Sequence, residues 1–371
     1  MKLVIFGLSI TSAWGNGHAT TYRALTRALH SRGHKIVFFE RNQEWYAGNR
    51  DLPEPPFCDV HLYEKWQEVL PSVRKNLRDC DVAIVGSYFP DGIDATQELI
   101  DADVPVKAFY DIDTPITVSQ LRRGGAEYLR AHQVAAFDLY FSFTGGPLLR
   151  ELETKFGAQR AVPLFCSFDP DQYFSRGISS RYACDLSYMG TYASDRQPKL
   201  ETLFCTPARN LPDSKFLLAG AQYPSRARWP DNVRLITHLS PQWHAHLYSS
   251  SRFVLNLTRQ EMVAAGYSPS VRLFEAAACG SVIVSDNWSG LETFFAPGEE
   301  ILLADNSDDV VSYLKGDQAQ FAEVGRRAQQ RVLAEHTSRH RAEQFESYVS
   351  MANQQHSTSH ADAKDAVLTS R

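Results

Sequence analysis

The segment that most constrains the fold is Gly266–Glu292, which reads GYSPSVRLFEAAACGSVIVSDNWSGLE. Ser268 is a typical N-cap and Pro269 a typical first helical residue, so we expect a helix to begin there. The helix runs to Gly280, the residue type that most often ends a helix, and the apolar run 281–284 predicts a buried strand. A loop, a helix, a strand and a second loop are half of a doubly wound α/β domain, in which ligands bind at the carboxyl ends of the strands.

The same segment suits the binding of a nucleoside diphosphate. The free N–H groups at the start of the predicted helix, around Ser268 and Ser270, form an anion site. Glu275 follows Pro269 by six residues, roughly 9 Å along a helix axis, which is about the distance from a diphosphate to the hydroxyls of its ribose. Because a carboxylate accepts hydrogen bonds from two hydroxyls at once, Glu275 is a candidate ribose-binding residue.

Arg272 leaves a second interpretation of this helix open. It lies three residues before Glu275, and a surface ion pair between these two side chains is the simpler alternative. Their neighbours Leu273, Phe274 and 276–278 are apolar, which predicts a buried helix, and charges on a buried helix usually serve a function. We therefore assign Arg272 to the same site as Glu275.

Length and composition predict a soluble protein of two domains. The chain has 371 residues, enough for two domains of roughly 150–180 residues, and its 43% hydrophobic and 22% charged residues are typical of globular proteins. The net charge of −5 argues against a general nucleic-acid binder, so we expect no nucleic-acid partner. No run approaches about 20 apolar residues, so we expect no transmembrane segment, while peripheral membrane contact stays open.

Two further features favour a cytoplasmic location. The first residues, MKLVIFGLSI, turn polar too soon for a signal peptide and suit a first strand. The six cysteines show no C-x-x-C spacing, which argues against a zinc site or a disulfide framework and favours reduced core residues.

Residues 1–165 show the alternation of strands and helices that predicts one parallel α/β domain. The domain begins with a strand at Lys2–Leu8, a glycine-containing loop at 9–17, a helix at His18–Ser31 and a strand at Lys35–Phe39. Residues 178–335 repeat this pattern after a segment rich in Pro and Asp and predict a second α/β domain.

A dinucleotide-binding site is the alternative interpretation of the first unit. Gly15 and Gly17 lie in its loop and Glu40 ends its second strand, as in the fingerprint of nicotinamide-nucleotide enzymes. Thr20, however, stands where that fingerprint needs its third glycine. A partial motif is weak evidence, and we expect no bound cofactor.

Three segments resemble glycosyltransferases of the GT-B fold, and most of all the CgeB-like (spore-maturation-protein-type) group. They are RLFEAAACGSVIVSD and SGLETFFAPGEEILL in the second half, and NGHATTYRALTRALHSRGHKIVFFE near the N-terminus. The resemblance implies two Rossmann-like domains that face each other across a cleft. The acceptor-side domain is expected at 1–165, the donor domain at 178–335, and a helix returning to the first domain at 336–352. Residues 353–371, rich in Gln, His, Ser and Ala, predict a disordered tail.

The resemblance also implies roles for residues at the donor site. In related families the Glu of the F-E-A segment contacts the donor ribose, a role that carries over to Glu275. Many of those families have a second Glu eight residues earlier, where this chain has Tyr267. The pair of glutamates is therefore incomplete, which argues against a standard retaining site, although Tyr267 is still placed at the donor site.

A turn in the second half matches the diphosphate-binding part of the same family. Gly190 and Tyr192 belong to a G-T-Y turn, and Arg196 and Lys199 follow it. Basic side chains at this place hold the donor diphosphate in GT-B enzymes. The alternative for both cations is a solvated position at the start of a helix.

His18 and Asp111 are the candidates for the base that activates an acceptor hydroxyl. His18 resembles the loop histidine of inverting GT-B enzymes, although a helix cap is the alternative. Asp111 ends the strand at 104–110, where functional loops gather. With Asp113 it spells D-x-D, the metal-binding pattern of the other large glycosyltransferase fold. The two-domain organisation argues against that fold, and we expect no metal.

Three residues are candidates for contacts with the acceptor. Asn16 lies in the first glycine-containing loop and Asp113 at a strand end. Trp45 belongs to the polar, aromatic segment 41–57, whose side chains suit stacking and hydrogen bonding with sugars.

The sequence thus predicts a metal-independent glycosyltransferase. It would move a hexosyl or related group from a nucleotide-sugar to an acceptor that is a glycan, a protein or a small molecule, with no other cofactor. A nucleotide-sugar epimerase and a catalytically inactive sugar- or nucleotide-binding module share all these features and stay open. The sequence does not specify the nucleotide, the sugar, the acceptor, the stereochemistry or the oligomeric state.

Overall fold

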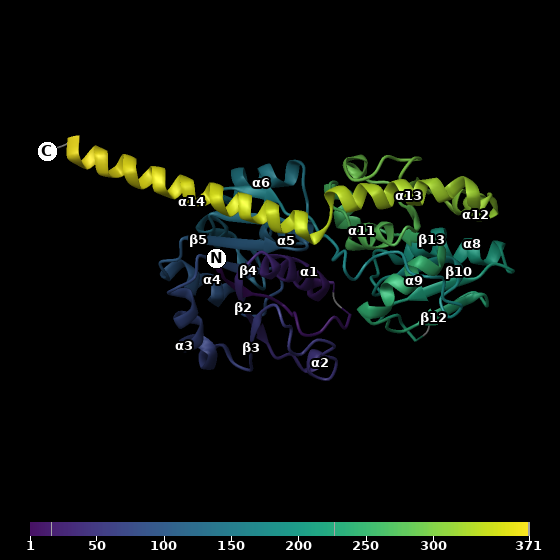
Figure 1. Ribbon diagram of the computed structural model, residues 1–371, viewed down its shortest axis with the longest axis horizontal. Coiled ribbons are helices and arrows are strands. Elements are labelled where there is room, and N and C mark those ends of the chain that lie inside the picture. The colour runs from purple at the N-terminus through teal and green to yellow at the C-terminus, as the bar shows by residue number, and fades with distance from the viewer. Residues whose placement is uncertain (16, 226, 370–371) are drawn as a thin grey trace.

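A computed structural model describes residues 1–369 of the protein except 16 and 226, and excludes the side chains of 318 and 356–369. In the part described, two parallel sheets of seven and six strands lie side by side, each covered by helices (Figure 1). Each sheet is the centre of one Rossmann-like domain, as the alternating pattern predicts.

The first sheet has the order β3-β2-β1-β4-β5-β8-β9, and all of its pairs are parallel. Its strands are β1 (Lys2–Phe6), β2 (Lys35–Arg41), β3 (Asp59–Tyr63), β4 (Val82–Gly86), β5 (Val106–Asp111), β8 (Leu139–Ser142) and β9 (Ala161–Pro163). Its helices are α1 (His18–Ser31), α2 (Glu44–Ala47), α3 (Trp66–Leu77), α4 (Gly92–Asp101), α5 (Thr114–Leu121) and α6 (Pro147–Phe156). A small hairpin of β6 (Gly125–Ala126) and β7 (Leu129–Arg130) follows α5.

The second sheet has the order β12-β11-β10-β13-β14-β15 and is also parallel. Its strands are β10 (Cys184–Met189), β11 (Phe216–Ala219), β12 (Val233–Ile236), β13 (Ser251–Asn256), β14 (Val282–Ser285) and β15 (Leu302–Leu303). Its helices are α7 (Gln197–Leu200), α8 (Thr206–Asn210), α9 (His244–Ser250), α10 (Gln260–Ala265), α11 (Val271–Ala278), α12 (Ser307–Lys315) and α13 (Gln318–Glu335).

The chain reverses its direction of winding beside the first strand of each sheet. In the first sheet β1 pairs with both β2 and β4, and in the second β10 pairs with both β11 and β13. Ligands of doubly wound sheets bind at these switch points, outside the carboxyl ends of the strands. The strands have apolar residues on both faces; all five residues of β4, for example, are buried.

The last helix returns to the first domain, as expected. α14 (Ser338–Thr369) lies across the first domain and packs against α1, β5 and β8 (Figure 1). Phe345 anchors it with its ring 5.3 Å from that of Phe141. The composition beyond 352 predicted disorder, whereas the helix continues to Thr369. The stretch 338–369 contains no glycine or proline that would end a helix.

The helix predicted in the Gly266–Glu292 segment is present but begins later than expected. Its N-cap is Ser270, so Ser268 and Pro269 precede the helix. The Ser268 hydroxyl accepts a hydrogen bond from Thr144 of the first domain at 2.9 Å, and the Pro269 carbonyl accepts one from Cys166. These contacts with distant segments hold the chain extended where local sequence favoured a helix start.

Within the part of the chain that the structure describes, none of the helices combines the length and the apolar character needed to cross a bilayer.

Candidate functional site

A cavity of about 370 Å³ lies between the two domains. The first domain contributes the β1–α1 loop, the start of α1 and the β5–α5 loop. The second domain contributes the segments after β10, β11 and β13 together with α11. The cavity therefore lies at the carboxyl ends of both sheets, next to both switch points.

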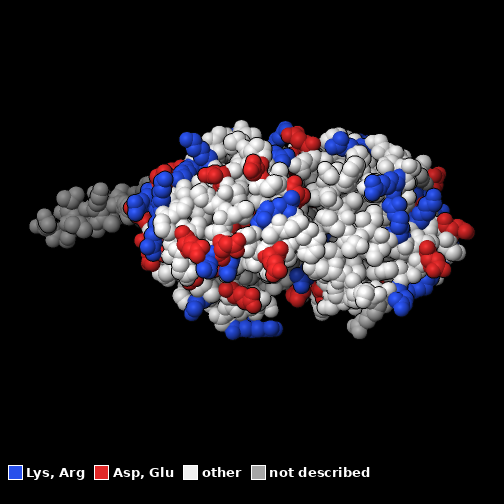
Figure 2. All heavy atoms as spheres, turned by 90° about the horizontal axis from the view of Figure 1, so that it is seen from below, with Lys and Arg blue, Asp and Glu red and all other residues white. Residues whose placement is uncertain are grey.

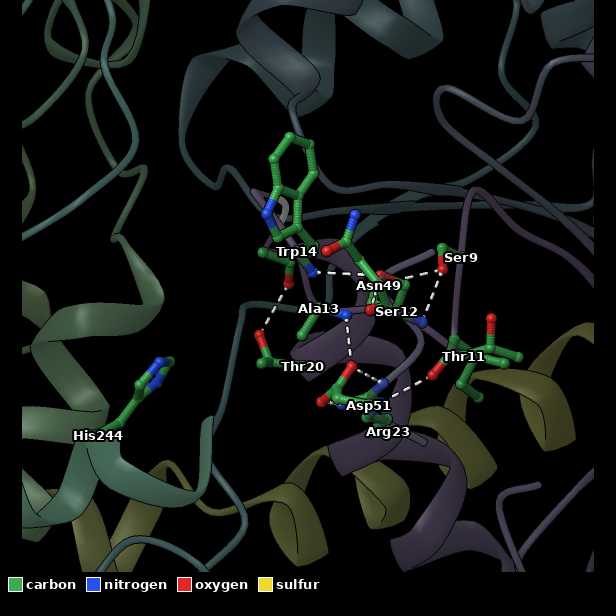
Figure 3. Close-up of polar contacts among 12 residues, drawn as sticks. Ser9, Thr11, Ser12, Ala13, Trp14, Thr20, Arg23, Asn49, Asp51 and His244 are labelled. Carbon is green, nitrogen blue, oxygen red and sulfur yellow. Dashed lines mark hydrogen bonds and ion pairs between the residues drawn. The ribbon is translucent and has the colours of Figure 1, made fainter. Parts of the chain in front are cut away.

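The β1–α1 loop is held in place from behind by two carboxylates. Buried Glu40 at the end of β2 accepts hydrogen bonds from Ile10 N at 2.6 Å and from Thr11 N at 3.0 Å. Asp51 accepts from Ala13 N at 2.8 Å and binds the guanidinium of Arg23 through both oxygens (Figure 3). A dinucleotide site would need the Glu40 carboxylate to bind a ribose. Here the carboxylate binds the backbone of the β1–α1 loop instead.

His18 and Asp113 form the polar part of the first-domain wall. His18 begins α1 and is 8% exposed, and its Nε2 lies 3.6 Å from the Asp113 carboxylate. Its Nδ1 has no hydrogen-bond partner among the described residues. The ring of Tyr88 packs edge-on against the imidazole at 5.4 Å. His18 thus lines the cavity beside a carboxylate that can stabilise its protonated form.

Asp111 lies beneath the cavity rather than in its wall. It is 0% exposed and accepts hydrogen bonds from Tyr140 at 2.5 Å and Thr117 at 2.8 Å. Burial raises its pKa to about 6. The two carboxylates of the D-x-D pattern therefore point to different places. Nowhere in the described residues do three or more His, Cys, Asp or Glu side chains gather as a metal site would require.

Glu275 lies at the cavity edge on α11, 3% exposed. Tyr248 donates to its Oε2 at 3.2 Å, and the Tyr173 hydroxyl also acts on its carboxyl group by favouring the ionised form. Burial raises the pKa of Glu275 to about 7. The hydrogen bond of its carboxyl group thus comes from Tyr248, in place of a surface ion pair with Arg272.

Arg272, on α11, joins two strands of the second sheet, β10 and β13, at the cavity. Its Nε donates to the Met189 carbonyl at 2.6 Å, and its Nη1 to Asn256 Oδ1 at 2.7 Å. Its guanidinium also lies over the ring of Tyr188, 5.0 Å from the centroid. Ser270 Oγ shares the Asn256 acceptor at 2.7 Å. Arg272 and Ser270 both line the cavity, as does Ser268.

Tyr267 lies outside the cavity wall, at the contact between the domains. Its carbonyl accepts a hydrogen bond from Gly145 N at 2.9 Å. Its ring fits between Gly146 and Gly290, and a Cβ added at either glycine would overlap it. The donor-site position implied by the family pattern is therefore not observed, and the residue instead packs one domain on the other.

Some residues of the G-T-Y turn and the segment after it line the cavity, and others lie outside its wall. Gly190 and Arg196 line the cavity, and Arg196 Nη2 donates to the Thr191 carbonyl at 2.6 Å. Lys199 lies outside the wall and forms an ion pair with buried Asp286. Tyr192 also lies outside the wall and packs against Tyr223, with ring centroids 5.6 Å apart. Of the two predicted diphosphate-binding cations, only Arg196 is therefore at the cavity.

Of the two acceptor-side candidates that the structure describes, Asp113 lies at the cavity and Trp45 does not. Trp45 is 53% exposed on α2, where its ring packs on Tyr46, and it is not part of the wall. Asn16 lies outside the described residues.

Several residues of the wall were not predicted. Arg259 lines the cavity and lies 3.5 Å from Asp195, and His244 faces the first-domain loop from α9 (Figure 3). Arg259 carried a usable signal, because it follows β13 directly, at the carboxyl end of a strand. No sequence signal marked His244, Tyr248 or Tyr173, because their segments reach the site only through the tertiary fold.

Comparisons with known proteins agree with this architecture. Residues 196–347 match the family model described as Glycosyl transferase-like. No curated protein sequence matches the chain.

Three solved structures illustrate the fold. Sucrose-phosphate synthase from Thermosynechococcus elongatus is 14% identical with a TM-score of 0.67, over 97% of this chain and 99% of that one. Anabaena HepE in complex with UDP and glucose is 13% identical with a TM-score of 0.70, over 95% and 100%. An α-glucosyltransferase in complex with UDP-glucose and DNA containing an abasic site is 14% identical with a TM-score of 0.68, over 94% and 99%. The chain therefore has the GT-B fold. Since one of these proteins is held with DNA, the comparisons give no support for excluding nucleic acid as a partner.

Proposed function

We propose that this protein is a glycosyltransferase of the CgeB-like group, acting in the cytoplasm without a metal ion. One observation carries the proposal: a single cavity between two domains brings a histidine and an aspartate of one domain opposite three arginines and a glutamate of the other. These residues are His18, Asp113, Arg196, Arg259, Arg272 and Glu275. The six cysteines, all free of disulfides, support a reducing compartment.

The second-domain wall suits a nucleotide-sugar donor. The start of α11 offers backbone N–H groups, and Arg196 and Arg259 add positive charge at the same cavity. Together they would stabilise the diphosphate that leaves during transfer, a role that needs no metal. Glu275 then lies farther along α11, where its carboxylate would accept hydrogen bonds from the ribose hydroxyls. Because two neighbouring structures contain UDP, we take a UDP-sugar as the first donor to test.

The first-domain wall suits activation of an acceptor hydroxyl. His18 would take the proton of that hydroxyl while its oxygen attacks the sugar, and Asp113 would stabilise the imidazolium. Basic and acidic side chains are interspersed over the face seen in Figure 2, which shows no continuous basic surface. With the net charge of −5, this supports an acceptor other than nucleic acid.

A panel of UDP-, GDP- and dTDP-sugars tests the proposal. The protein is incubated with each donor, alone and with glycan, small-molecule and DNA acceptors, and the products are identified by mass spectrometry. Release of nucleoside diphosphate with transfer or hydrolysis is expected. Formation of an isomeric nucleotide-sugar would indicate an epimerase. Binding detected by thermal shift without any product would indicate an inactive module, and transfer to DNA would overturn the exclusion of nucleic acid.

A further inference from the structure

Two tyrosines from different parts of the chain act on the Glu275 carboxyl group. Tyr248 belongs to α9, and Tyr173 to the segment that connects the two sheets. Both phenol rings are buried; the Tyr248 hydroxyl donates to the carboxyl group, and the Tyr173 hydroxyl lies near enough to act on the same group. The orientation of Glu275 at the cavity edge is thus fixed by the protein itself.

Tyr173 also contacts His244, which lines the same cavity. The Tyr173 hydroxyl lies 3.1 Å from His244 Nδ1, and His244 Nε2 lies 3.0 Å from the Leu239 carbonyl oxygen. A carbonyl oxygen only accepts hydrogen bonds, so Nε2 carries the proton. Burial lowers the pKa of His244 to about 4, so the ring is neutral and its Nδ1 is an acceptor.

The single proton of Tyr173 therefore has two competing acceptors. When Glu275 is protonated, Tyr173 is free to donate to His244 and to accept from the Glu275 carboxylic acid. When Glu275 is ionised, Tyr173 donates to the carboxylate, and His244 Nδ1 gives up this partner. The arrangement of the three side chains thus follows the protonation of Glu275.

Few other titratable groups act on Glu275. Arg272 on the same helix favours the ionised form, whereas Cys166 and Cys279 are buried thiols with pKa values raised by burial. Because burial raises the pKa of Glu275 to about 7, both forms are populated near neutral pH.

We propose that Tyr173 and Tyr248 are positioning residues of the nucleotide site, and that a nucleoside diphosphate binds the arrangement in which Tyr173 has turned from His244 to an ionised Glu275. This inference rests on the proposed role of Glu275 as the ribose-binding carboxylate. Two ribose hydroxyls both donate to the group only when it carries no proton. Binding below neutral pH therefore transfers the Glu275 proton to the solvent.

Calorimetric titration of UDP in two buffers of different ionisation enthalpy measures this proton. The terminal phosphate of UDP also titrates near pH 6, so Glu275→Gln, which lacks the titrating carboxyl group, supplies the reference. About one pH unit below the Glu275 pKa we expect wild type to release roughly 0.9 proton per UDP more than Glu275→Gln, and about one unit above it roughly 0.1 more. Equal proton release by the two proteins below neutral pH would overturn the proposal.

Proton release on UDP binding falls with pH, and the pH at which it is half complete is the midpoint. Substitutions of the two tyrosines should shift this midpoint. Tyr173→Phe and Tyr248→Phe each remove a hydroxyl that favours the carboxylate, so each should move the midpoint to higher pH. Tyr22→Phe is the matched control, because the Tyr22 hydroxyl is buried in the first domain and has no hydrogen-bond partner among the described residues. Tyrosines with a merely structural role would lower the melting temperature and leave the midpoint unchanged, which would also overturn the proposal.

A second measurement separates this inference from the proposed function. If UDP binds at neither pH, the nucleotide site fails, and the network is then measured by urea denaturation across the same pH range. In the protein that has Glu275, Tyr248→Phe should shift the pH-dependent fall in unfolding free energy to higher pH. In the Glu275→Gln background, the effect of Tyr248→Phe should be the same at every pH. Equal pH profiles of Tyr248→Phe and wild type would count against the network itself.

Discussion

At the residue scale, the site is built from side chains whose surroundings set their chemistry. His18 is nearly buried, has an unpartnered Nδ1 and faces Asp113, whereas Asp111, two residues earlier, is enclosed by Tyr140 and Thr117. The strand-end position marked both aspartates in the sequence. Residues two apart in a strand share one face, so strand geometry alone would place both side chains together. They separate because β5 ends at Asp111, whereas Asp113 lies in the turn before α5 and lines the cavity.

His18→Ala should lower the rate of sugar transfer by about 10²- to 10⁴-fold, the usual contribution of a general base. The rate of nucleoside diphosphate release under saturating donor measures it. His30→Ala is the matched control, since His30 is exposed in the last turn of the same helix. A His18→Ala protein that keeps the wild-type rate would exclude His18 as the base.

The buried carboxyls should also make stability depend on pH. Burial raises the pKa of Glu275 from 4.5 to about 7 and that of Asp111 from 3.8 to about 6. The folded protein keeps protons that the unfolded chain releases, so this stabilisation is complete below about pH 4 and is lost as pH rises through about 6 to 7. For Glu275 the difference is about 3 kcal/mol. Glu275→Gln should flatten the decline in unfolding free energy seen by urea denaturation; an unchanged decline would contradict the raised pKa.

At the element scale, local sequence predicted where helices and strands lie better than where they begin. Gly280 ends α11 with a φ of +77°, as its residue type indicates, and β14 follows at once. The start of α11 was misplaced by two residues because Thr144 and Cys166, far away in the sequence, bind Ser268 and Pro269. Contacts of this kind leave no trace in the local pattern.

The contact of Tyr267 with the two glycines offers a prediction at this scale. Gly146 has a φ of +65° and a ψ of −150°, a conformation nearly restricted to glycine, and Tyr267 occupies the space of a side chain there. Gly146→Ala should therefore destabilise the protein by at least about 1–3 kcal/mol in thermal unfolding. Gly177→Ala, where an added Cβ meets no atom, should be nearly neutral. Equal melting temperatures of the two variants would contradict this account of the domain contact.

At the scale of the whole molecule, the fold followed from sequence because alternating buried strands and amphipathic helices admit few arrangements. The strand orders place both switch points at one cavity, and α14 ties the second domain back to the first. What the sequence could not supply was the set of side chains that meet there. Lys199 is taken up by Asp286, while Arg259, Tyr173 and His244 arrive from segments far apart in the chain.

Titration of UDP into wild type and Glu275→Gln decides whether this cavity binds a nucleotide-sugar through Glu275. The titration is made about one pH unit above the Glu275 pKa, with melting curves recorded beside it and Glu335→Gln, an exposed change on α13, as control. We predict that wild type and the control bind UDP equally, and that Glu275→Gln binds more weakly by about 1.5–3 kcal/mol, roughly 10- to 150-fold, without a lower melting temperature. Unchanged affinity in Glu275→Gln, or a wild-type protein that binds no UDP, would rule out Glu275 as the ribose-binding residue.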